Sequence, residues 1–82
     1  MRTWRTRFHR ELTGLLVETL NNRADQHDES ADAFGWTAAA ADSCGRYVQA
    51  DQLRDAARHS RVEAIKLRAF ARAAQHQCSS NG

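Results

Sequence analysis

With 82 residues, the chain is long enough for one small domain, and chains of this size bury only about 60% of the surface that they expose when unfolded. Its composition is 41% hydrophobic and 27% charged with four glycines and no proline, which excludes a disordered, collagenous or loop-rich protein. The net charge of +2 is unevenly spread, because residues 1–10 and 46–82 are basic whereas residues 11–45 are acidic. A uniformly basic coat for nucleic acid is therefore excluded as well.

The sequence carries no sign of a membrane or secreted protein. No stretch approaches the roughly 18 apolar residues that cross a bilayer, and the first residues lack the apolar run of a secretory signal. Two cysteines, Cys44 and Cys78, are too few for a disulfide scaffold. We therefore expect a soluble, cytoplasmic protein with reduced cysteines.

The first periodic segment covers residues 3–20. Its apolar side chains recur at the three- and four-residue spacing of an amphipathic helix: Trp4, Phe8, Leu12, Leu15, Leu16 and Leu20. Residues 22–30 are polar apart from one alanine, so we expect the helix to end at Asn21 and Asn22 and a surface connection to follow.

A second helix is predicted to begin near Ser30, whose side chain suits an N-cap. Its apolar set is Phe34, Ala38, Ala41 and Val48, with Trp36, Ala40 and Tyr47 on a neighbouring line. Gly45 is the expected end of this helix, although the apolar period continues through Val48.

The third and longest segment covers residues 50–77. One face has a heptad-like spacing and contains Leu53, Ala57, Ser60, Ala64, Leu67, Ala71 and Ala74. The run from Ser60 to Glu63 also matches a capping box, which leaves open a break into two helices at Ser60. Residues 78–82 are small and polar and are expected to fray.

The pattern as a whole predicts an all-α protein, a small bundle of three or possibly four helices with a long C-terminal helix. Residues 1–77 form the single domain and residues 78–82 the frayed tail. Because many of the hydrophobic residues are only alanine, the predicted core is thin, and a homodimer or a partner that completes the core becomes plausible.

One charged stripe on the third predicted helix is the main candidate for a binding surface. At about 100° per residue, five arginines and one isoleucine share a narrow band over roughly 27 Å: Arg54, Arg58, Arg61, Ile65, Arg68 and Arg72. An arginine row around an apolar centre is typical of a docking surface for acidic residues or phosphates. The alternative interpretation is a solvated helix face with one tolerated exposed isoleucine.

A secondary basic patch lies near the N-terminus and consists of Arg2, Arg5, Arg7 and Arg10. Cations at a helix N-terminus oppose the helix dipole, so a partner is one reason for their presence. Trp4 and Phe8 among them allow stacking on single-stranded nucleic acid. Their core spacing with Leu12 instead favours burial.

Acidic side chains and one histidine form a ladder at four-residue spacing, namely Asp51, Asp55, His59 and Glu63. These are metal-ligand types, but the ligand motif of a di-iron bundle is absent, and charged helix flanks are common. His76, Cys78 and Cys44 make a zinc site only if the fold brings them together. We therefore predict no metal, no cofactor and no catalytic residues, and a protein that is not an enzyme.

Two functional hypotheses follow. The first is a small regulator or inhibitor whose arginine stripe binds an acidic surface of a larger protein or nucleoprotein complex. Small chains rich in Arg and Ala are often encoded by phages or other mobile elements, which makes a host defence or transcription machine a target to test. The second is direct binding of nucleic acid through the stripe and the N-terminal arginines. A structural homodimer packed through the alanines of the second predicted helix is a further alternative.

Overall fold

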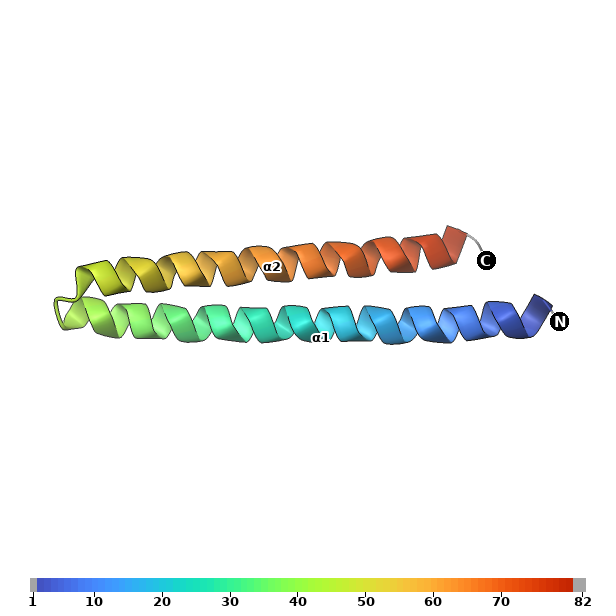
Figure 1. The fold of residues 1–82 in the computed structure, drawn as a ribbon, viewed down its shortest axis with the longest axis horizontal. Helices are drawn as coiled ribbons and strands as arrows, with labels where there is room; N and C mark the ends of the chain where they lie inside the picture. Colours follow the sequence, from blue (N-terminus) through green and yellow to red (C-terminus); the bar gives the residue numbers. More distant parts are fainter. Residues whose placement is uncertain (1, 81–82) are drawn as a thin grey trace.

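The computed structural model describes the backbone of residues 2–80 and the side chains of residues 7–77. Two long helices, α1 (Arg2–Ser43) and α2 (Tyr47–Ser80), run antiparallel and form a hairpin (Figure 1). The Cα atoms span 66 × 15 × 11 Å, so the molecule is a rod two helices wide. The all-α prediction is confirmed for the described chain, whereas the prediction of three or four helices is wrong.

The first two predicted helices are one continuous helix, because the expected surface connection at residues 22–30 is itself helical. This stretch contains neither glycine nor proline. Its polar residues surround Ala24, His27 and Ala31, which keep the four- and three-residue spacing toward α2. Packing of this narrow line against a second helix therefore outweighs the polar character of the rest.

The turn between the helices has the geometry of a Schellman motif. Gly45 has a φ of +77°, a left-handed conformation that glycine adopts without a steric penalty. The Arg46 amide donates to the Ala41 carbonyl at 2.8 Å and the Gly45 amide donates to the Asp42 carbonyl at 3.0 Å. These bonds satisfy carbonyls at the end of α1, so the predicted helix end at Gly45 is confirmed.

The two helices meet along a seam of very small side chains. The buried residues recur at intervals of seven: Val17, Ala24, Ala31 and Ala38 in α1, and Ala50, Ala57, Ala64 and Ala71 in α2. Ion pairs from Arg54 to Asp42 and from Arg68 to Asp25 mark the register of the two antiparallel helices. The small methyl groups allow the two backbones to lie close together. We call this contact the alanine seam.

Larger side chains alternate with the alanines along the seam and are only half-buried, as at Leu20, Phe34, Leu53 and Leu67. Ser60 occupies one of these positions and is 8% exposed. It faces α1 inside an unbroken α2, so the possible helix break at Ser60 is absent. The predicted face of the long helix is confirmed, and the helix extends from Tyr47 to Ser80.

Several apolar residues that were expected in the core lie outside it. Phe8, Leu12, Leu15 and Leu16 are each about half exposed or more, and Val48 belongs to α2 and is exposed. They face away from α2, because the seam at this level consists of Thr13, Val17 and Leu20. The side chain of Trp4 lies outside the described residues.

Candidate protein-binding surface

The structure divides the predicted arginine stripe into two rows. Arg54, Arg61 and Arg68 are spaced seven residues apart, each four residues after a buried alanine, and reach across to α1. We call these three the inner row. A second set has the same seven-residue spacing, but each member directly follows a buried alanine and so lies further from α1 around the helix. This set, Arg58, Ile65 and Arg72, is the outer row.

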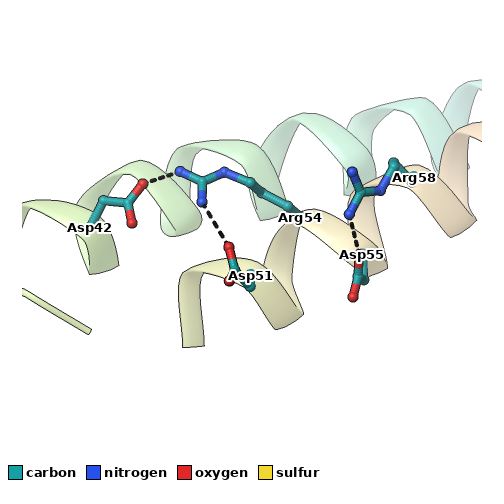
Figure 2. A network of polar contacts seen from close by, with 5 residues as sticks. All are labelled: Asp42, Asp51, Arg54, Asp55 and Arg58. Carbon is teal, nitrogen blue, oxygen red and sulfur yellow. Dashed lines mark hydrogen bonds and ion pairs between the residues drawn. The ribbon is translucent and has the colours of Figure 1, made fainter. Parts of the chain in front are cut away.

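Every arginine of the inner row forms an ion pair with an aspartate of α1. Arg68 Nη2 lies 2.7 Å from Asp28 Oδ2 and 2.9 Å from Asp25 Oδ1, and Arg61 Nη2 lies 3.2 Å from Asp32 Oδ1. Arg54 donates to Asp42 of α1 and lies 3.3 Å from Asp51 of its own helix, as Figure 2 shows. The inner row therefore neutralises the acidic middle of α1 and joins the two helices.

These contacts raise the pKa of two of the guanidinium groups. Hydrogen bonds to Asp28 and then Asp25 raise the pKa of Arg68, and the hydrogen bond and charge of Asp42 raise the pKa of Arg54. A raised pKa of a base adds stability that is fully present below its ordinary pKa and is lost only as the pH rises through the raised value. Arg54 and Arg68 accordingly stay charged throughout the physiological pH range.

The outer row faces solvent. Arg58 pairs with Asp55 of its own helix, with both side chains more than 70% exposed (Figure 2). Ile65 is 66% exposed, and Arg72 makes no ion pair within the described side chains. A β-branched apolar residue therefore lies in water between two exposed guanidinium groups.

A tryptophan that the sequence analysis placed on the flank of a buried helix face lies beside these rows. Trp36 is 80% exposed and lines a shallow, open depression of about 280 Å³ with Asp32, Gly35, Ala39 and Arg61. The sequence did indicate that Trp36 is exposed. It lies at a seven-residue interval from Glu29 and from Ser43, on the side of α1 that faces away from the alanines. We call the side that holds both rows, their aspartates and Trp36 the charged face.

The secondary basic patch lies at the open end of the hairpin. Arg7 and Arg10 are exposed, and Arg7 Nε lies 3.8 Å from Glu11 Oε1. The side chains of Arg2 and Arg5 lie outside the described residues. The patch, on α1, lies far along the rod from the inner row, on α2. The structure therefore does not bring the two sets of arginines together.

The acidic ladder of α2 is occupied by ion pairs within the helix. Asp51, Asp55 and Glu63 each contact the base three residues further on, namely Arg54, Arg58 and Lys66. Within residues 7–77, no group of three His, Cys, Asp or Glu side chains is arranged to hold a metal ion. Cys44 is a free, exposed thiol in the turn.

Comparison with protein-family models, with curated proteins and with solved structures finds no match to this chain. Neither α1 nor α2 has a stretch that is long and apolar enough to cross a membrane, over the part of the chain that the structure describes.

Proposed function

We propose that the protein is a small, non-enzymatic regulator that binds an acidic surface of a larger protein or nucleoprotein complex through its charged face. The observation that carries this proposal is the outer row, in which exposed Ile65 lies between exposed Arg58 and Arg72. Such a mixture of an apolar centre and a guanidinium rim is typical of binding surfaces, where a few central residues supply most of the affinity. Trp36 adds a second exposed apolar anchor on the same face.

The ion pairs of the inner row favour a protein partner over nucleic acid. Arg54, Arg61 and Arg68 already meet carboxylates of α1, and those carboxylates also repel a phosphate backbone. A protein partner, in contrast, supplies apolar contacts to Ile65 and Trp36 as well as isolated acidic groups for the outer row. Blocking another machine requires only that this surface be occupied, which suits an extended rod.

An affinity pull-down from lysate of the source cells, with and without nuclease, tests the proposal. The outer-row variant combines Arg58→Glu, Ile65→Asp and Arg72→Glu. The matched control combines Arg46→Glu, Val62→Asp and Lys66→Glu, which makes the same change of charge at exposed positions outside the outer row. We expect a protein that survives nuclease, is retained by the control and is lost with the outer-row variant.

Two results would contradict the proposal. Recovery that disappears with nuclease, together with an affinity that falls by about 0.9 in log K per log salt for each phosphate contacted, would identify duplex nucleic acid instead. Equal capture by the outer-row variant and the control would show that the outer row is a solvated helix face.

A further inference from the structure

The side of the hairpin opposite the ion pairs that join the two helices carries few charges. It is formed by the residues that directly precede the buried positions of the seam: Leu16, Arg23, Ser30 and Thr37 of α1 and Gln49, Ala56, Glu63 and Phe70 of α2. The aspartates and arginines of the ion pairs instead follow the buried positions by one or four residues, which turns them to the other side of the helices. We call this second surface the opposite face.

An apolar cluster spans both helices on the opposite face. Leu16 is 51% exposed and Phe70 is 64% exposed, and the half-buried Leu20 and Leu67 lie between them. The Arg68–Asp25 ion pair places Leu67 and Phe70 close to the level of Leu20, and Leu16 lies about one turn further toward the open end of the hairpin. Large apolar side chains that are contributed by two elements and left in water mark an interaction surface.

We propose that a second copy of this chain packs on the opposite face, with both turns at the same end, to form a four-helix bundle. Where both helices are present, the face measures about 48 by 20 Å, so two copies bury roughly 1,900 Å² in total. This area reaches the upper part of the range of about 1,200–2,000 Å² for standard stable interfaces. The alanine seam already joins α1 to α2 within one chain. The dimer that we propose therefore packs through the opposite face and not, as the sequence analysis expected, through the alanines.

Opposite charges on the opposite face favour one orientation of the second copy. Arg23 makes no ion pair within the described side chains, whereas Glu63, whose side chain is 34% exposed, lies 3.4 Å from Lys66. With both turns at one end, α1 of one copy lies over α2 of the other, which puts the opposite charges of Arg23 and the second copy's Glu63 on facing helices. The apolar clusters of the two copies also meet at the same height.

The reversed orientation is less favourable. If the turns lay at opposite ends with full overlap, Glu63 would meet Glu63 of the second copy near the centre of the interface. Like charges in a partly desolvated contact repel strongly. Leu16 would in addition lie against Thr37, which separates the two apolar clusters.

Molecular mass in solution tests the choice of face. We expect wild-type protein to sediment at twice 9.2 kDa and Phe70→Asp to sediment at 9.2 kDa at equal concentration. Val48→Asp is the matched control, because Val48 is 68% exposed but lies on the outer side of α2, and it is expected to stay dimeric. Leu16→Gln is a milder second variant, with helicity followed by circular dichroism, in case Phe70→Asp unfolds.

A distance measurement tests the orientation. In a Cys78→Ser background, a spin label on Cys44 places one probe on each turn. We expect the two labels within about 25 Å, because packed helices lie about 10 Å apart and the label tethers add the rest. A separation near the length of the overlapped face, about 48 Å, would overturn the orientation.

Wild-type protein that remains at 9.2 kDa at every concentration, or a Phe70→Asp variant that stays dimeric, would overturn the dimer. The inference does not depend on the proposed function. The outer-row variant is expected to keep its dimeric mass even when it loses its partner, so failure of one proposal is distinguishable from failure of the other.

Discussion

Alanine is the residue on which this structure depends, because its methyl group is the side chain at most of the fully buried positions. Ala24, Ala31, Ala50 and Ala64 have no exposed surface, yet each buries only one methyl group. The stabilisation per position is therefore small, on the order of 0.8 kcal/mol per buried CH₂-sized group. What the alanines supply is a close approach of the two backbones, which a larger side chain prevents.

Ala31→Leu is expected to destabilise the hairpin by about 1–3 kcal/mol, because the added carbons have no space between the helices. The measurement is urea denaturation followed by circular dichroism. Ala33→Leu, at an exposed position two residues away, is the control and is expected to leave the midpoint nearly unchanged. Equal effects of the two changes would show that the alanine seam tolerates larger side chains.

At the scale of the elements, the glycines of α1 and of the turn differ in what they require of the backbone. Gly45 has a positive φ, whereas Gly35 lies inside α1 without one, and a Cβ added at either position would meet no atom within 4 Å beyond its chain neighbours and the local helix backbone. The effect of an added methyl group is thus determined by the backbone conformation alone. Gly45 ends a helix, and Gly35 weakens one.

Replacing these glycines by alanine is expected to have opposite effects on the free energy of unfolding. Gly45→Ala lowers it by roughly 1–2 kcal/mol, because alanine is strained in the left-handed region. Gly35→Ala raises it by about 0.5–1 kcal/mol, because alanine favours the helix and has fewer unfolded conformations. Thermal denaturation of both variants provides the comparison, and stabilisation by Gly45→Ala would contradict the turn geometry.

The sequence was sufficient to predict the turn and most of α2, but not α1. The line from Leu53 to Ala74 has one unbroken heptad spacing, and Gly45 is a strong helix end. In α1 the large residues Phe8, Leu12 and Leu15 suggested one buried face, whereas the seam follows Val17, Ala24 and Ala31. Alanine adds little to a hydrophobic pattern, so the larger apolar side chains masked the seven-residue spacing of the buried residues in α1.

The composition of the candidate site could be predicted, but the partners of its arginines could not. The spacing placed Arg54, Arg61 and Arg68 on one stripe with Arg58 and Arg72. Which of them face α1 depends on the register between two helices. The turn sets that register for residues far from it in the sequence. The register therefore cannot be read from the local pattern around each arginine.

At the scale of the whole molecule, the chain is far more extended than a globular protein of its length. Its radius of gyration is 18.6 Å, against about 12 Å for a compact domain of this size. The length results from α1 and α2 lying side by side as unbroken helices (Figure 1). A rod of this kind presents two long faces, of which one is ionic and the other carries few charges.

Small-angle X-ray scattering is expected to give a radius of gyration near 18.6 Å, with a distance distribution that is skewed as for a rod. A second copy packed alongside adds to the width and changes this value little. Protein in strong denaturant, at about 28 Å, marks the unfolded limit. A value near 12 Å would mean that the chain folds back into a shorter bundle.

The strict seven-residue repeat of the alanine seam leaves the alignment of the two helices nearly degenerate. A slip of α2 by one heptad would place Ala57 where Ala50 lies and Arg61 where Arg54 lies, so the alanines distinguish the two alignments only weakly, although Gln75 would take the place of Arg68. The covalent turn around Gly45 removes this ambiguity by fixing where α2 begins. If the chain were cut there, the alanine repeat alone would allow the two helices to pair at more than one offset.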